Sequence, residues 1–258
     1  MSPADSSTED TLDLKLPPEV VALFAATPLG PSAPLGPSGR PGPSHAPDLP
    51  GRAGPHSLTG LTHGPRVPAD LLDRVAHWPA ARTAAGLLRL VPVEPERDLA
   101  LLAGWMNDPA VAEFWQLAGD PRVTERHVRA QLAGDGRSLP CLGVLDGVPM
   151  SYWEIYRADL DPIARHYPAR PHDTGVHLLI GGVPDRARGL GSELLHAVST
   201  LVLDHRPACT RVVAEPDLRN TPSVAAFLSA GFRFCAEVDL PDKRAALMVR
   251  DRALCHLL

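Results

Sequence analysis

Prolines crowd the start of this 258-residue chain and restrict the part of it that can fold. Eleven of the 29 prolines fall between Pro28 and Pro68, with eight glycines interleaved. Such a segment buries too little apolar surface to offset its chain entropy, so we predict that residues 1–67 are a largely disordered Pro/Gly/Ser-rich region. A short helix could form at Pro17–Ala26, and Pro28 would end it. The remainder is rich in Leu, Val and Ala and is long enough for a substantial core.

The charge balance and the cysteine spacing exclude several classes of protein. The formal net charge of −5 disfavours non-specific binding to nucleic acid or to an anionic membrane, since both require a cationic surface. Cys141, Cys209, Cys235 and Cys255 form no C-x-x-C pair, so we predict neither a metal site nor a disulfide framework. Because residues 1–16 lack a signal-peptide core and no window has the apolar length of a membrane span, we expect a cytoplasmic protein.

From Gly86 onward the apolar residues repeat with the periods of strands and helices. The pattern predicts strands at 87–93, 142–145, 148–156, 175–181, 211–215, 232–238 and 245–249, and helices at 98–105, 111–117, 124–132, 190–203 and 221–230. Thr124 is the expected cap of its helix, and Asp146-Gly147 predicts a type I′ hairpin turn. Residues 68–85 are expected to form a helical elaboration, with a helix over 70–75. This order predicts an α+β domain over 86–258 with a mixed α/β sheet, not a dinucleotide-binding fold.

The segment Arg186-Ala187-Arg188-Gly189-Leu190-Gly191 lies between a predicted strand and a predicted helix. A glycine turn at a helix start directs unpaired backbone amides and the positive helix end at one point, which suits a pyrophosphate group. Glycine also lets the backbone approach phosphate oxygens closely. By itself, however, such a glycine pair is weak evidence, because ordinary strand-to-helix turns carry it more often than phosphate sites do.

The residues that follow this turn give it a family context. Glu215-Pro216-Asp217-Leu218-Arg219-Asn220 precedes a helix that ends at Gly231, and the combination resembles the GNAT superfamily over Leu87–Val249. The resemblance implies a GNAT acyl-CoA acyltransferase fold in which the turn binds the pyrophosphate of coenzyme A. The residues it assigns to that cosubstrate are Leu178, Ile180, Arg186, Arg188, Gly189, Leu190, Gly191 and Asn220.

Further stretches are similar to acyltransferases of siderophore biosynthesis. They are Met150–Tyr156, His172–His177, Glu215–Asn220 and Leu240–Met248. The resemblance implies acyl transfer from acetyl-CoA, succinyl-CoA or a longer acyl-CoA, with no permanently bound cofactor. The acceptor would be a side-chain amine or hydroxylamine of lysine, ornithine or a related diamine. The product would be a hydroxamate arm for ferric iron, made alongside other enzymes of a siderophore pathway.

Mechanism restricts the catalytic candidates to residues that can take a proton. An amine attacks a thioester only when it is neutral, so the site needs a base. His177 matches the family's proposed base, and either Asp217 or Glu215 could orient it or accept the proton. Alternate residues of an extended segment point the same way, so spacing does not choose between the two. We favour Asp217, which could equally be part of a helix-capping network around Asn220.

The remaining candidates concern the carbonyl and the acceptor. Backbone amides of Leu178–Ile180 would stabilise the oxyanion. Candidate acceptor-binding residues are Trp153, Glu154, Tyr156, Asp173, Lys243 and Arg244, the last two for a carboxylate. Alternatively, the tryptophan belongs to the core and the basic pair is a solvated hairpin tip. Two other functions stay open: an aminoglycoside 6′-N-acetyltransferase, and a non-catalytic acyl-CoA-binding scaffold that recruits partners through its Pro/Gly arm.

Overall fold

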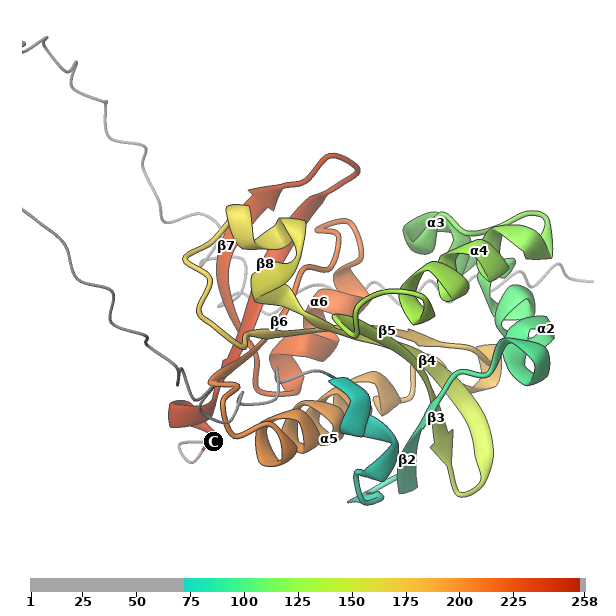
Figure 1. Ribbon diagram of the computed structural model, residues 1–258, viewed down its shortest axis with the longest axis horizontal. Coiled ribbons are helices and arrows are strands. Elements are labelled where there is room, and N and C mark those ends of the chain that lie inside the picture. Colours follow the sequence, from blue (N-terminus) through green and yellow to red (C-terminus); the bar gives the residue numbers. More distant parts are fainter. Residues whose placement is uncertain (1–71, 256–258) are drawn as a thin grey trace, which may run out of the picture. The chain divides into compact units, whose positions relative to one another are not determined.

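The computed structural model describes residues 72–255, so the predicted disordered region 1–67 and the helix at 17–26 lie outside it. One mixed sheet of eight strands runs through the described part, in the order β1-β2-β3-β4-β5-β6-β8-β7 (Figure 1). The strands are β1 (Ala81–Thr83), β2 (Gly86–Pro92), β3 (Ser138–Leu145), β4 (Val148–Arg157), β5 (Thr174–Ile180), β6 (Arg211–Ala214), β7 (Arg233–Asp239) and β8 (Arg244–Asp251).

Two groups of helices pack on opposite faces of this sheet. The helices are α2 (Pro95–Met106), α3 (Pro109–Trp115), α4 (Pro121–Leu132), α5 (Leu190–His205) and α6 (Thr221–Ser229), with short 3-10 turns at η1 (Leu72–His77), η2 (Ala158–Leu160), η3 (Pro162–Arg165), η4 (Val183–Asp185) and η5 (Arg252–Leu254). Tyr152 of β4 is buried with residues of α2, α3 and α4, whereas its neighbour Trp153 is buried with residues of α5. Successive strand residues face opposite sides, so β4 contributes to both cores.

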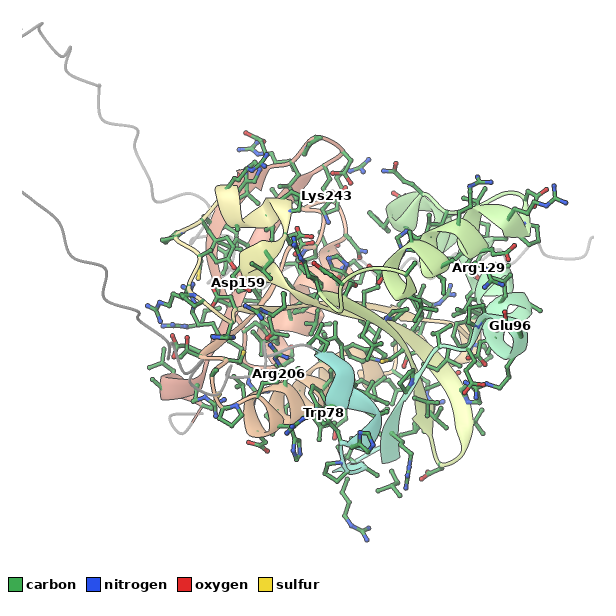
Figure 2. All side chains as sticks on the ribbon, viewed as in Figure 1. Trp78, Glu96, Arg129, Asp159, Arg206 and Lys243 are labelled. Atoms are coloured by element: carbon green, nitrogen blue, oxygen red, sulfur yellow. The ribbon has the colours of Figure 1, made fainter. Side chains whose placement is uncertain are left out.

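The helices on the first face are held to one another as well as to the sheet. Arg129 of α4 forms an ion pair with Glu96 of α2, at 3.1 Å between Nη2 and Oε1 (Figure 2). Within residues 72–255, no helix is long and apolar enough to cross a membrane.

The predicted order of elements from β2 to β8 is confirmed. Asp146 and Gly147 have φ values of 47° and 86°, as a type I′ turn requires. The expected cap at Thr124 is wrong: α4 begins three residues earlier, because Pro121 fits its first turn and Asp120 accepts a hydrogen bond from the amide of Arg122. The short strand β1 was not predicted.

The two central strands β5 and β6 separate soon after they meet. They pair in parallel only at Thr174–Val212 and Gly175–Val213. Beyond that point β5 continues along β4 as far as Ile180, and β6 continues along β8. The edge of β5 from Val176 onward is therefore not paired with β6, and a wedge opens between the two strands.

Candidate active site

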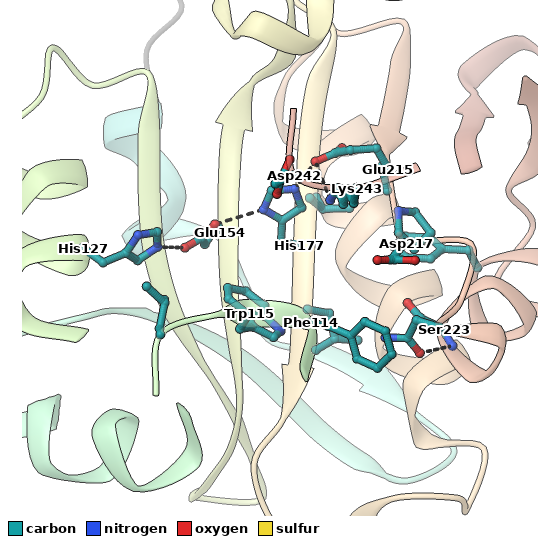
Figure 3. Close-up of a pocket in the computed structure, with 17 residues that line it drawn as sticks. Phe114, Trp115, His127, Glu154, His177, Glu215, Asp217, Ser223, Asp242 and Lys243 are labelled. Carbon is teal, nitrogen blue, oxygen red and sulfur yellow. Dashed lines mark hydrogen bonds and ion pairs between the residues drawn. The ribbon is translucent and has the colours of Figure 1, made fainter. Parts of the chain in front are cut away.

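A cavity of about 260 Å³ lies where β5 and β6 diverge (Figure 3). Its walls come from α3, α4, β4, β5, the end of β6 and the segment after it, α6, and the turn between β7 and β8. Its lining residues are Phe114, Trp115, Leu117, His127, Glu154, Val176, His177, Leu178, Ala214, Glu215, Pro216, Asp217, Asn220, Ser223, Phe227, Asp242 and Lys243.

His177 stands in this cavity between two carboxylates. Glu154 lies directly across the antiparallel β4–β5 ladder, which places both side chains on one face of the sheet. Nδ1 of His177 is 2.9 Å from Oε2 of Glu154, and Nε2 contacts Oε1 of Glu215. The hydroxyl of Tyr156 donates to the other oxygen of Glu215 at 2.7 Å, and Nζ of Lys243 is 3.8 Å from Oε1.

These contacts fix the charges of the site. Burial of the ring lowers the pKa of His177, but the charge of Glu215 and the hydrogen bonds to both glutamates outweigh burial and raise that pKa to about 10. Burial also raises the pKa of Glu154, yet hydrogen bonds from His127 and His177 hold it well below its usual range. For Glu215, burial is likewise outweighed, chiefly by the charge of His177. At neutral pH the cavity therefore holds an imidazolium between two carboxylates.

The turn before α5 exposes backbone amides at the other end of the wedge. Gly189 precedes α5 with a φ of 76°, and no side chain caps the helix. The amides of the first turn thus lack a side-chain acceptor, as an anion site requires. Arg186 does not project freely: its guanidinium bonds the carbonyls of Ile180 and Gly181 and forms a 2.8 Å ion pair with Asp108.

A protein-family model for the acetyltransferase (GNAT) domain matches residues 94–240, which is more than half of the chain. The chain belongs to the GNAT acetyltransferase family. The expected fold and enzyme class, a GNAT acyltransferase, are confirmed.

Individual relatives of this GNAT acyltransferase act on amino acids or on aminoglycosides. Lysine N-acyltransferase MbtK of Mycolicibacterium paratuberculosis is 40% identical over 194 residues, 72% of this chain and 85% of the relative. N(6)-hydroxylysine O-acetyltransferase of Escherichia coli is 35% identical over 159 residues, 62% of this chain and 50% of the relative. Among solved structures, aminoglycoside acetyltransferase AAC(6′)-Ib in complex with coenzyme A matches this chain with a TM-score of 0.58 and 27% sequence identity. The match covers 66% of this chain and 96% of that one. The predicted resemblance to lysine and hydroxylysine acyltransferases is confirmed.

Of the two candidates Asp217 and Glu215, only Glu215 contacts His177. Asp217 lines the cavity, but its carboxylate bonds the guanidinium and the backbone amide of Arg219. The contact corrects our preference for Asp217 as the residue that orients His177. Asn220 caps α6 by accepting a hydrogen bond from the amide of Ser223 at 3.1 Å, and it also lines the cavity.

Four residues predicted to bind the acceptor do not line the cavity of the GNAT acyltransferase: Trp153, Tyr156, Asp173 and Arg244. Tyr156 is buried, and its hydroxyl donates to Glu215. Trp153 is fully buried on the opposite face of β4, because Glu154 takes the cavity side. Asp173 is fully buried against Arg211, whose charge it balances. Arg244 turns outward to Glu237 on β7. Of the predicted basic pair, only Lys243 lines the cavity.

Two residues that sequence reasoning missed complete the cluster. His127 and Gln131, one turn apart on α4, both reach Oε1 of Glu154, at 2.5 and 2.7 Å. Their spacing of four residues places them on one face of a predicted helix, which was a usable signal. Sequence alone did not show that this face would lie over β4. Within residues 72–255, no group of three His, Cys, Asp or Glu side chains could hold a metal ion.

Proposed function

We propose that this chain transfers an acyl group from acyl-CoA to the side-chain amine or hydroxylamine of lysine, ornithine or a related diamine, and so prepares a hydroxamate arm for a siderophore. The relatives at 35–40% identity, whose names specify lysine and hydroxylysine, support the acceptor class. The observation that carries the proposal is the base cluster, His177 between Glu154 and Glu215, beside the wedge that would receive a thioester.

The donor side fits coenzyme A. Uncapped amides at the start of α5 would bind the pyrophosphate, and a side chain at Gly189 would find nothing within 4 Å, so the approach is open. The unpaired edge of β5 offers backbone amides at Leu178–Ile180 for the pantetheine arm and the thioester carbonyl. Arg186, in contrast, would act by holding the turn to the end of β5 rather than by contacting phosphate.

The acceptor side fits a cationic amine. Four carboxylates line the cavity, at Glu154, Glu215, Asp217 and Asp242. Arg219 balances the charge of Asp217, and the other three carboxylates face the imidazolium of His177 and the ammonium of Lys243. The surplus of negative charge favours a bound ammonium group. Lys243 would bind an α-carboxylate at the far end of an amino-acid acceptor, a contact that a diamine such as cadaverine cannot make.

The reaction requires the amine nitrogen to lose a proton before it attacks. In the proposed mechanism the ammonium proton passes to the fraction of His177 that is neutral, and the neutral nitrogen of the acceptor then attacks the thioester carbonyl. The tetrahedral intermediate then collapses, the C–S bond breaks, and the leaving thiolate takes the second proton of the nitrogen. A hydroxylamine acceptor is already neutral, so His177 takes the one proton that its nitrogen loses during attack and then passes that proton to the leaving thiolate.

A test of the proposal uses the purified full chain with acetyl-CoA and succinyl-CoA. Acceptors are lysine, N6-hydroxylysine, ornithine, cadaverine and kanamycin, with thiol release and product mass measured in parallel. We expect an acylated amino acid or diamine, and a loss of about 10²- to 10⁴-fold in kcat for His177→Asn. Acylation of kanamycin alone would establish the aminoglycoside activity instead, and acyl-CoA binding without turnover of any acceptor would favour the scaffold.

A further inference from the structure

One carboxylate, that of Glu154, is shared by two histidines that reach it from different elements. Oε2 faces Nδ1 of His177 on β5 at 2.9 Å, and Oε1 faces Nε2 of His127 on α4 at 2.5 Å. Dashed lines in Figure 3 connect the three side chains in series. The proposed function uses His177 and leaves His127 without a role.

The contact between His127 and Glu154 requires a hydrogen between the two atoms. A carboxylate oxygen and an unprotonated ring nitrogen would oppose lone pairs at 2.5 Å, so Nε2 must donate. The side chain of Glu154 is only 10% exposed, which strengthens each charge-assisted bond that it accepts. His127 thus takes up part of the negative charge that Glu154 would otherwise direct at His177.

His127 is distinct from the other donors to the same oxygen. Gln131 donates to Oε1 at 2.7 Å and Tyr152 at 3.0 Å, and both are neutral groups. The ring nitrogen of His127 is nearer to this oxygen than either of them, at 2.5 Å, so it should draw more of the carboxylate's negative charge than they do. Loss of either of these donors should therefore have the same direction of effect on His177 as loss of His127, but a smaller one.

We infer that His127 is a positioning residue for the base: by holding one oxygen of Glu154, it limits how firmly that carboxylate retains the proton of His177. The inference deepens the proposed function and rests on it for the role of His177 as base. Without His127, the imidazolium of His177 would persist to higher pH, and less of the base would be free at neutral pH.

Several other ionisable groups lie near this pair of histidines. They are Tyr152 and Tyr156 on β4, Glu215 after β6, Asp161 before η3, and Asp242 and Lys243 in the β7–β8 turn. None of them joins the two histidines directly, as Glu154 does. The effect of His127 should therefore depend on the carboxylate of Glu154.

The test is an NMR titration of the His177 imidazole in the full chain, with its signal assigned from the His177→Asn spectrum. We expect His127→Leu to raise the pKa of His177 by about 0.5 to 1 pH unit. Gln131→Leu should raise it less. Arg126→Leu is the matched control, because it removes a positive charge from an exposed neighbouring position on α4 and should change nothing.

A double-mutant cycle isolates the path through Glu154. In a Glu154→Gln background, His127→Leu should leave the pKa of His177 unchanged. The inference fails if His127→Leu lowers that pKa or leaves it alone in the wild-type background, or if its effect persists in Glu154→Gln. His127→Phe, which keeps a ring but has no N–H donor, provides a second variant should the leucine variant unfold, and it should raise the pKa of His177 in the same way. The titration needs no acceptor, so a chain that acylated none of the tested amines would refute the proposed function separately.

Discussion

Replacement of Glu154 by glutamine tests whether the two carboxylates set the base strength of His177. The amide keeps the shape of the side chain and can still accept a hydrogen bond from Nδ1 at the position now 2.9 Å away, but it carries no charge. His177 would then face one carboxylate instead of two. Since a nearby negative charge favours the imidazolium, the substitution must lower the pKa of His177.

The size of the expected pKa change follows from the contact of His177 with two carboxylates. The pKa of His177 rises from an ordinary 6.5 to about 10 although burial opposes the rise, so the two glutamates together supply the whole increase. With one carboxylate on each ring nitrogen, removal of one should take back about two pH units. The neutral form of His177 at pH 7 would become about a hundredfold more abundant.

The assay is the pH dependence of kcat/KM with N6-hydroxylysine, whose side-chain nitrogen is uncharged at neutral pH and does not add its own titration. For the wild type we expect activity to rise with pH toward the pKa of His177, near 10. In Glu154→Gln the acid limb should move down by about two pH units, with a lower plateau because Nδ1 is held less firmly. Asp239→Asn, on a side chain that is 90% exposed, is the control and should leave the limb in place. If the acid limb of the pH profile is unchanged in Glu154→Gln, or moves to higher pH, then Glu154 does not raise the pKa of His177.

Three further predictions concern other parts of the site. Gly189→Glu puts a negative side chain at the start of α5, on a backbone with a φ of 76°, and should weaken coenzyme A binding at least tenfold, as measured by calorimetry. The control is Gly119→Glu, at a φ of 117° in an open loop, which should not weaken that binding. Lys243→Met should raise KM for lysine and leave KM for cadaverine unchanged in steady-state assays; an equal effect on both would rule out a carboxylate contact. Gly175→Ala places a methyl group inside the ring of Tyr156 and should lower the free energy of unfolding by about 1–3 kcal/mol in urea titrations; an unchanged midpoint would contradict the packing.

The elements that were predicted well are those whose signals are local. The hairpin turn at Asp146-Gly147 follows from residues that tolerate positive φ, and the glycine turn before α5 follows from its place between an apolar strand and an apolar helix. The start of α4 was missed because Thr124 and Asp120 are both plausible caps, and only Pro121 at the first turn distinguishes them.

The site was harder to predict because its contacts depend on how distant segments pack. Glu215 and Asp217 are indistinguishable by spacing, and the choice depends on the path of the chain after β6, where Arg219 engages Asp217 and leaves Glu215 for His177. The face of β4 that meets the cavity is set by its register with β5, which pairs Glu154 with His177 and turns Trp153 away.

The charges of the cavity suggest how an acceptor would activate its own base. Glu215 already contacts the imidazolium of His177 and lies 3.8 Å from the ammonium of Lys243. An ammonium group bound beside it adds a third cation to one carboxylate, and the mutual repulsion lowers the proton affinity of His177. On the proposed mechanism, binding of an amine should therefore lower the pKa of His177 below its value of about 10 in the free site. A neutral hydroxylamine should not, and NMR titrations with a dead-end pair, coenzyme A plus lysine or N6-hydroxylysine, would separate the two. Equal pKa values in the two complexes would mean that the acceptor nitrogen lies away from Glu215.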